Sequence, residues 1–508
     1  MNPRVTISHE QKRLILQEDL DAAKSRGERN KLGQFATPGT LANQIITHAG
    51  VLLGETEDIR FLDPAIGTGS FYSALRSLYP NARISAARGY EIDRHYAESA
   101  ICLWRGTNLE LRLADFTKEK PEPCFNMLIC NPPYVRHHHI ANEDKIRLRL
   151  TAHEISGVNL SGLSGLYCYF IALAHGWMSD EGVAGWLVPS EFMDVNYGKA
   201  IKQYLLTQVT LLQIHRFDPR DVQFADALVS SSVVWFRKAP PPPGHNVKFT
   251  YGGTFAEPTT SRLVSIDALA QESKWTRFPV HERRSPNTRG IVSDFFKIKR
   301  GIATGDNDFF ILPEEEIERR GLPLELFRPI LPSPRYVKSD EVESDPEGVP
   351  CLEKRLFLLD SKLAESEIER RFPELYTYLQ EGRAKGLHER YLCRHRSLWY
   401  AQEARPPAPV VCTYLGRADT KNGRPFRFIL NKSKATIANV YLAMYPTALT
   451  EKAMQADPTF VRRAWEALNR INPDQLLSEG RVYGGGLHKL EPKELANVPV
   501  PELMELLP

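Results

Sequence analysis

Between residues 59 and 238 the chain alternates short apolar runs with segments whose apolar positions recur at helical spacing. The apolar runs predict strands, and the segments between them predict helices. Strands joined by helices of this length form parallel βαβ units. The expected strands are 59–65, 83–93, 109–116, 124–134, 182–190, 209–217 and 227–238, and the expected helices are 70–80, 95–106, 166–178 and 198–208.

The last two expected strands are connected differently from the others. Only residues 218–226 separate them, which is too short for a crossover helix, so we expect them to pair antiparallel. The pattern as a whole predicts an α/β fold with a doubly wound, mostly parallel, seven-stranded sheet.

A run of four prolines and a glycine at 240–244 marks a loop, because proline cannot continue a strand. Beyond it the regular alternation of strands and helices is lost, and a polar stretch at 281–290 precedes a region of mixed character. We therefore expect two domains. Residues 1–285 would hold an N-terminal helical segment and the α/β sheet, and residues 286–508 an α+β domain.

Composition excludes several classes of protein. With 508 residues, 42% hydrophobic and 25% charged, the chain is neither disordered nor fibrous. No apolar run approaches the roughly 18 residues of a membrane span, and the first 20 residues mix charges throughout, so we expect a cytoplasmic protein without membrane contact. The seven cysteines form no CxxC pair, and the three histidines at 137–139 lack ligand spacing, so no metal is expected.

The formal net charge is only +3, but the charges are unevenly distributed, with a basic segment at 381–440. This segment holds twelve lysines and arginines against four carboxylates, a net charge of +8. Arginine beside aromatic faces suits contact with phosphates and bases, and the alternative is a solvated basic surface. The interleaved aromatic residues are Tyr391, Trp399, Tyr400, Tyr414, Phe426 and Phe428.

Three successive strand ends carry residues suited to a nucleoside. The glycine-rich turn DPAIGTGS at 63–70 follows the first strand, Glu91 follows the second, and Asp115 and Phe116 end the third. Glycines let the backbone approach a ligand, and a carboxylate after the second strand can accept hydrogen bonds from ribose hydroxyls. The turn is neither GxGxxG nor GxxxxGK[ST], which disfavours a dinucleotide or a triphosphate.

The fourth strand ends in Asn131-Pro132-Pro133-Tyr134. An amine conjugated to a purine is a poor nucleophile because its lone pair is delocalised. If the Asn131 side-chain oxygen and the Pro132 carbonyl each accept one of its N–H groups, the nitrogen becomes tetrahedral and its lone pair points at an electrophile. Two adjacent prolines preorganise these acceptors, and Tyr134 can stack on the base.

At these motifs the chain resembles the class I, S-adenosylmethionine-dependent DNA amino-methyltransferases with the gamma order of motifs, and most closely the TaqI-type adenine-N6 enzymes of type II restriction–modification systems. The resemblance covers most of residues 30–236 and implies a Rossmann-like fold. It implies a catalytic role for Asn131, Pro132, Pro133 and Tyr134. It also implies that the cofactor S-adenosylmethionine is bound by Thr37, Asp63, Ala65, Gly67, Glu91, Ile92, Asp115, Phe116 and Phe170, and that the flipped adenine stacks between Tyr134 and Phe224.

The resemblance also implies a C-terminal target recognition domain, to which GIATGDNDFFIL at 301–312 and the segment 483–492 would belong. The expected partner is double-stranded DNA, and a cognate restriction endonuclease is expected on a separate chain. Three alternatives stay open at this point. They are methylation of protein glutamine or RNA, methylation of cytosine-N4, and a non-catalytic DNA-binding module.

Overall fold

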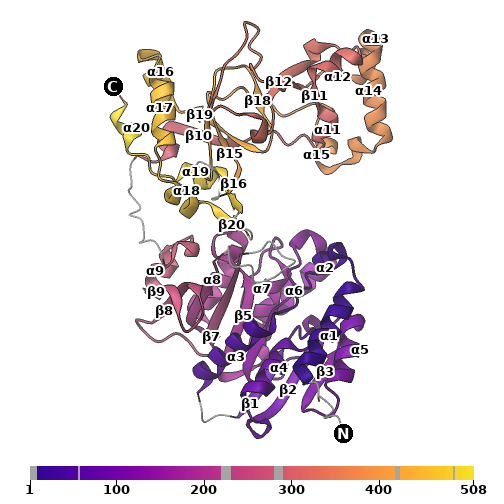
Figure 1. Ribbon diagram of the computed structural model, residues 1–508, viewed down its shortest axis with the longest axis vertical. Helices are drawn as coiled ribbons and strands as arrows, with labels where there is room; N and C mark the ends of the chain where they lie inside the picture. The colour runs from indigo at the N-terminus through magenta and orange to yellow at the C-terminus, as the bar shows by residue number, and fades with distance from the viewer. Residues whose placement is uncertain are drawn as a thin grey trace, which may run out of the picture. The chain divides into compact units, whose positions relative to one another are not determined.

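The computed structural model describes residues 8–54, 58–218, 230–279, 290–417, 424–483 and 487–507. The chain forms two compact units that divide between Arg283 and Arg284. Figure 1 labels most elements of both units. This division lies beside the domain boundary expected at 285/286.

The first unit contains one nine-stranded sheet with the order β3-β2-β1-β4-β5-β7-β6-β8-β9. The pairs β3–β2, β2–β1, β1–β4 and β4–β5 are parallel. β7 runs antiparallel to both β5 and β6, which confirms the antiparallel pair expected from the short connection. The strands are β1 Ile59–Asp63, β2 Ile84–Glu91, β3 Leu109–Leu113, β4 Phe125–Cys130, β5 Met178–Pro189, β6 Thr210–Arg216, β7 Ser231–Arg237, β8 Asn246–Gly253 and β9 Pro258–Ser265.

The expected count of seven strands is wrong, because β8 and β9 extend the sheet. Both come from the segment after the proline run, where the regular strand–helix alternation has ended. β8 pairs parallel to β6 and β9 pairs antiparallel to β8. β8 pairs with the backbone of β6 that would otherwise form a sheet edge, and its Val247 and Phe249 side chains are fully buried in the same core as Ile214 of β6.

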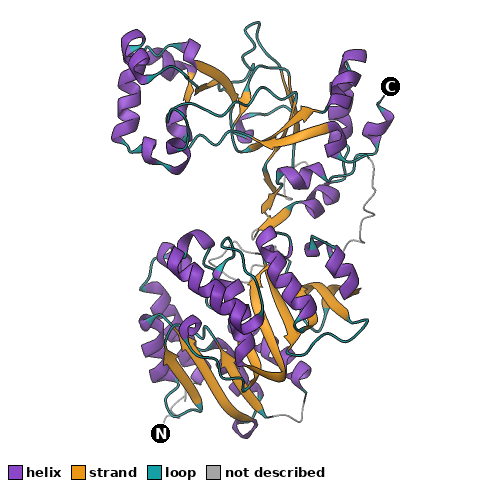
Figure 2. Ribbon diagram, turned by 180° about the vertical axis from the view of Figure 1, so that it is seen from behind, coloured by secondary structure: helices purple, strands orange, loops and turns teal. Residues whose placement is uncertain are grey.

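Helices cover both faces of this sheet (Figure 2). Neighbouring residues of β4 point to opposite faces: Leu128 packs into the core under α6, α7 and α8, and Met127 packs into the core under α3, α4 and α5. The polar helix α6 was not predicted, since only Leu148, Ala152 and Ser156 on it are buried. The helices are α1 His9–Ala22, α2 Arg26–Leu32, α3 Gly39–Leu53, α4 Ser70–Leu78, α5 Arg94–Leu103, α6 Asn142–Ser156, α7 Leu166–Ala174, α8 Lys199–Thr207 and α9 Ile266–Gln271.

The second unit is an α+β structure with three smaller sheets, ordered β10-β19-β15-β17-β13, β11-β14-β12-β18 and β16-β21-β20. Its strands are β10 Phe296–Arg300, β11 Ile311–Pro313, β12 Phe327–Leu331, β13 Glu341–Val342, β14 Leu356–Leu359, β15 Val410–Thr413, β16 Leu415–Arg417, β17 Phe428–Asn431, β18 Thr436–Ile437, β19 Tyr441–Pro446, β20 Arg481–Tyr483 and β21 Leu487–Lys489.

The helices of the second unit are short, apart from α14 and α17. They are α10 Val292–Phe295, α11 Asn307–Phe310, α12 Glu314–Arg319, α13 Glu365–Arg371, α14 Pro373–Ala384, α15 Tyr391–Arg394, α16 Ala448–Ala456, α17 Phe460–Asn469, α18 Pro473–Glu479, α19 Pro492–Ala496 and α20 Glu502–Glu505. Across the described ranges of both units, every helix is too short or too polar to cross a membrane.

Candidate functional site

Four of the expected site residues lie at the carboxyl ends of four neighbouring parallel strands. Asp63 ends β1 and Glu91 ends β2, while Asp115 and Asn131 follow β3 and β4 closely. Because these strands are adjacent in the order β3-β2-β1-β4, their ends meet at one edge of the sheet. Ligands of open α/β sheets bind at this edge.

The loops after β1 and β2 are joined through the Glu91 carboxylate. The Gly67 N–H donates to Glu91 Oε2 at 3.1 Å, and the Asp93 N–H donates to Glu91 Oε1 at 2.8 Å. Asp63, which is buried, accepts the Ala65 N–H at 3.1 Å and so shapes the first turn of the β1 loop. The two loops therefore form one hydrogen-bonded unit.

Burial changes the acidity of Asp63 and Glu91 at this edge. Loss of solvent raises the pKa of Asp63 to about 8, although hydrogen bonds from the Ala65 N–H and the Cys130 side chain act in the opposite direction. Loss of solvent also raises the pKa of Glu91 to about 7, with a smaller effect from the neighbouring Asp93 carboxylate. Glu91 consequently changes its charge near neutral pH.

Apolar side chains follow the ends of β2 and β3 and lie on α7. The rings of Phe116 and Phe170 are both buried, and their centroids are 5.4 Å apart. Ile92 is 68% exposed, which leaves an apolar side chain open to a ligand. Asp115 Oδ1 accepts hydrogen bonds from the N–H and hydroxyl of Thr117 at 3.0 and 2.8 Å, so this carboxylate also caps the turn that carries Phe116.

The Asn131 side chain is fixed by the segment that precedes α3. Its Nδ2 donates to the Phe35 carbonyl at 2.8 Å and to Thr37 Oγ1 at 3.1 Å. A carbonyl can only accept, so the nitrogen must be the amide atom on this side. The Asn131 side-chain oxygen consequently points away from Phe35 and Thr37, and among the described residues it accepts no hydrogen bond.

The Tyr134 backbone and ring are held from two sides. Its N–H donates to the Gly33 carbonyl at 3.2 Å, and its hydroxyl donates to the Leu187 carbonyl of β5 at 3.0 Å. Gly33 has a φ of +66°, and a Cβ atom there would lie 2.4 Å from the Tyr134 nitrogen, so a side chain is excluded. The Phe35 ring lies 5.6 Å from the Tyr134 ring. The expected second stacking residue, Phe224, lies outside the described residues.

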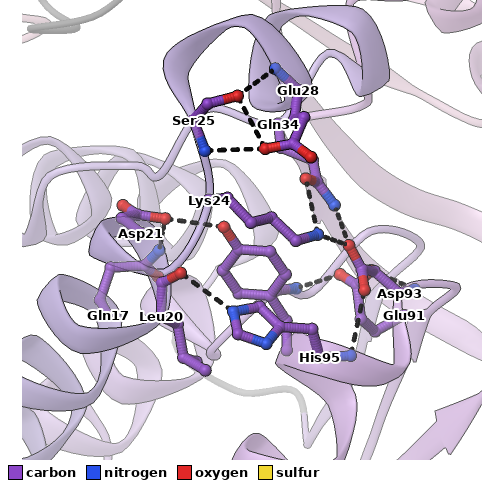
Figure 3. A network of polar contacts seen from close by, with 12 residues as sticks. Gln17, Leu20, Asp21, Lys24, Ser25, Glu28, Gln34, Glu91, Asp93 and His95 are labelled. Carbon is purple, nitrogen blue, oxygen red and sulfur yellow. Dashed lines mark hydrogen bonds and ion pairs between the residues drawn. The ribbon is translucent and has the colours of Figure 1, made fainter.

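Side chains of the N-terminal segment contact the same loops, and two of them, Gln17 and Lys24, belong to no motif of the sequence (Figure 3). Lys24 forms an ion pair with Asp93, and Gln34 Nε2 donates to the same carboxylate oxygen at 2.7 Å. The Thr68 hydroxyl donates to Gln17 Oε1 at 2.6 Å. The local signal in the sequence was weak, because Asp93 shows only the pattern of a helix cap and Lys24 belongs to no motif.

The basic segment in the second unit is largely engaged within the protein. Five of its six aromatic side chains are buried, so the expectation that these rings contact nucleic acid is wrong for all except the exposed Tyr391. They pack inward because the surrounding strands and loops contribute to the core of the unit. The five are Trp399, Tyr400, Tyr414, Phe426 and Phe428.

Several cations of this segment have carboxylate partners. Arg396 instead donates to the Ala303 and Thr304 carbonyls at 2.9 and 2.8 Å. By contrast, the described contacts of Arg394 include the ring of Tyr391 and no carboxylate. The ion pairs are Arg383–Glu365, Arg390–Asp306, Arg405–Glu403, Arg427–Asp340 and Lys432–Glu341.

His137, His138 and His139 form a short 3-10 turn that begins three residues after Tyr134. Within the described ranges, no three His, Cys, Asp or Glu side chains gather as ligands for a metal ion.

Two family models match separate parts of the chain. The Eco57I restriction-modification methylase model matches residues 86–223, and the model of the C-terminal domain of the type II methyltransferase M.Eco57I matches residues 280–507. The first match includes Glu91, Asp115 and Asn131, and the second covers nearly all of the second unit.

Two curated relatives match over most of their length. The type II methyltransferase M.AccI of Acinetobacter calcoaceticus is 25% identical over 498 residues, which cover 94% of this chain and 87% of that protein. The type II methyltransferase M.XamI of Xanthomonas campestris pv. amaranthicola is 26% identical over 497 residues, which cover 94% of this chain and 86% of that protein. Both relatives are named as type II methyltransferases, and the chain is similar in sequence to them and to the two family models.

Two solved structures share the fold at lower identity. The DrdV–DNA complex has a TM-score of 0.51 and 13% identity, and the match covers 94% of this chain and 56% of that one. The type IIL restriction-modification enzyme MmeI in complex with DNA has a TM-score of 0.50 and 13% identity, and the match covers 89% of this chain and 64% of that one. The chain thus spans less than two thirds of either protein, and the likeness concerns the fold alone.

Proposed function

We propose that this chain, which is related to the methyltransferases of type II restriction–modification systems, transfers a methyl group from S-adenosylmethionine to the N6 amine of an adenine in double-stranded DNA. The observation that carries this proposal is the fixed orientation of the Asn131 amide. Its N–H groups are engaged by Phe35 and Thr37, so its oxygen is set to accept a hydrogen bond from an amine.

The cofactor site fits S-adenosylmethionine on two counts. Each Glu91 oxygen accepts one backbone N–H and retains a second lone pair, so the carboxylate can also accept the two ribose hydroxyls. Ile92, Phe116 and Phe170 supply apolar surface for a purine. When bound, the cofactor would supply an electrophilic methyl group on a sulfonium.

The residues of the chain would prepare the amine for this methyl group. The Asn131 oxygen and the Pro132 carbonyl accept its two N–H groups, which localises the lone pair on nitrogen. Electrostatic preorganisation of this kind is a large part of enzymatic rate enhancement. The Tyr134 ring, held by its bond to Leu187, provides a face on which the base can stack.

The target adenine must leave the duplex to reach Asn131, at a cost of a few kcal/mol. The second unit would bind the duplex as a target recognition domain. Methylation at the recognised sequence would protect that sequence from a restriction endonuclease on a separate chain.

The test uses purified full-length protein, radiolabelled S-adenosylmethionine and duplex DNA. We expect label on adenine, and we expect Asn131→Ala to abolish it while cofactor binding and thermal unfolding stay close to wild type. Parallel reactions with ribosomal RNA and with protein release factor test the alternative substrates. Label in either of these but not in DNA, or label on cytosine, would contradict the proposal.

Base-resolved modification sequencing of DNA from cells that express the chain would then identify the recognition sequence and the modified position. An unmodified genome combined with an active purified protein would point to a different natural substrate.

A further inference from the structure

We propose that Lys24, together with Gln34, is a positioning residue for the cofactor: the two side chains hold the loop after β2 so that Glu91 stays in place against the loop after β1. This inference rests on the proposed function, because Glu91 is placed there as the acceptor of the ribose hydroxyls. It assigns a role to the N-terminal segment, whose helices α1 and α2 precede every motif of the site.

The side chains of Lys24 and Gln34 both contact the Asp93 carboxylate (Figure 3). Lys24, in the link between α1 and α2, forms an ion pair with Asp93 Oδ2, and Gln34 Nε2 donates to the same oxygen at 2.7 Å. The side chains of Lys24 and Asp93 are only 19% and 17% exposed. An ion pair this well covered is screened less by water and salt than a surface pair.

Asp93 connects this contact to the cofactor site. Its backbone N–H donates to Glu91 Oε1 at 2.8 Å, and its Oδ1 accepts the His95 N–H at 3.0 Å, which caps α5. The remaining oxygen, Oδ2, faces Lys24 and Gln34. A displacement of Asp93 would therefore move Glu91 and the start of α5 together.

Helix α1 also contacts the loop after β1. Gln17 accepts the Thr68 hydroxyl at 2.6 Å, and the buried Arg13, which is paired with Glu10, donates to Thr68 Oγ1 at 3.3 Å. Thr68 directly follows Gly67, whose N–H donates to the other Glu91 oxygen at 3.1 Å. The N-terminal segment thus spans both loops and fixes them relative to each other.

Further contacts keep α1 against α5. The Tyr96 hydroxyl donates to Asp21 Oδ1 at 2.8 Å, and His95 Nε2 lies 2.9 Å from the Leu20 carbonyl. Loss of Lys24 alone would consequently leave the helix attached and change mainly the contact at Asp93. This makes a single substitution at residue 24 a specific probe.

The charge of Lys24 provides a readout that a purely structural role would not change. Lys24 is the cation that faces Glu91, and the other charged groups near it are the carboxylates of Asp93 and Asp63. Lys24 lowers the pKa of Glu91, against the effects of burial and of Asp93. Removal of this cation should raise that pKa and shift the pH dependence of cofactor binding upward.

The experiment measures the Kd of S-adenosylmethionine by calorimetry between pH 6 and 9 for the full-length wild type, Lys24→Met, Gln34→Leu and Lys238→Met. Lys238 is the matched control, because its side chain is 18% exposed and pairs with Asp180 at 3.6 Å, at the opposite end of β5 from the site. We expect Lys24→Met to bind about five- to tenfold more weakly and with a higher pH midpoint, and Lys238→Met to match wild type.

The outcomes separate this inference from the proposed function. If the wild-type protein does not bind S-adenosylmethionine, the proposed function is wrong, and this inference, which depends on it, is wrong as well. If wild type binds and methylates DNA but Lys24→Met has the same Kd and pH midpoint, the inference alone is overturned. If Lys24→Met fails to fold, the Kd of Gln34→Leu is the test of the inference. Binding of S-adenosylmethionine that is about threefold weaker supports the positioning role, and unchanged binding overturns it.

Discussion

Asn131 donates through its side-chain amide to the carbonyl of Phe35, 96 residues earlier in the chain, at 2.8 Å. This bond fixes which atom of the amide faces the proposed target base. The segment before α3 therefore sets the orientation of the proposed catalytic side chain.

Two substitutions of Thr37, the second acceptor of this amide, test how much its hydrogen bond to Asn131 contributes to methylation. Thr37→Val removes the Oγ1 that lies 3.1 Å from Asn131 Nδ2, but it leaves the Phe35 carbonyl in place. We expect kcat for DNA methylation to fall about five- to tenfold, as for one lost hydrogen bond. Thr37→Ser, which keeps the hydroxyl, should stay within about twofold of wild type. Equal kcat values for the two variants would contradict the role of Thr37.

The close approach of Gly33 to Tyr134 can be separated from the conformational preference of glycine. Gly33 ends α2 with φ +66°, and Gly157 ends α6 with φ +69°, but a Cβ atom meets backbone only at residue 33. Alanine at either position should cost about 1–2 kcal/mol of folding free energy from the left-handed backbone. Only Gly33→Ala should also reduce methylation strongly, because it displaces Tyr134. Equal activity losses in both variants, measured alongside thermal unfolding, would refute this explanation.

Cofactor binding should depend on pH through Glu91. Burial raises its pKa to about 7, and the ionised form is the better acceptor for ribose hydroxyls, so binding draws on the deprotonated form and releases a proton. We expect the affinity to decrease as the pH falls below about 7, approaching tenfold per pH unit well below the pKa. Glu91→Gln should bind weakly, with this titration absent. Calorimetry across pH 5.5–8.5 measures both curves, and a flat wild-type curve would contradict the assignment.

The cations of the second unit should contribute unequally to DNA binding. Arg383 is held by Glu365, whereas Arg394 lies exposed beside Tyr391. Arg394→Ala should weaken DNA binding about three- to tenfold and reduce the salt dependence by about one phosphate contact. Arg383→Ala should change DNA affinity little, since its charge is already neutralised internally. Fluorescence anisotropy at several salt concentrations compares the two, and a larger effect of Arg383→Ala would contradict the distinction.

The local pattern of the sequence was sufficient to predict the strands β1 to β7 and the carboxyl-edge positions of Asp63, Glu91, Asp115 and Asn131. Apolar runs and turn residues reflect forces that act over a few residues, and parallel βαβ units then bring the strand ends together. The antiparallel pairing of β6 and β7 followed from the length of one connection.

Contacts between residues far apart in the chain could be decided only by the tertiary structure. Local spacing in the sequence does not indicate the ion pair between Lys24 and Asp93 or the burial of Trp399 and Tyr400. It also does not indicate that β8 and β9 join the sheet. A lysine in a polar link has the same sequence pattern whether it faces solvent or a carboxylate 69 residues away. Burial and partner depend on how the whole chain packs, and that packing converts a set of strand-end motifs into a site with defined acceptors and charges.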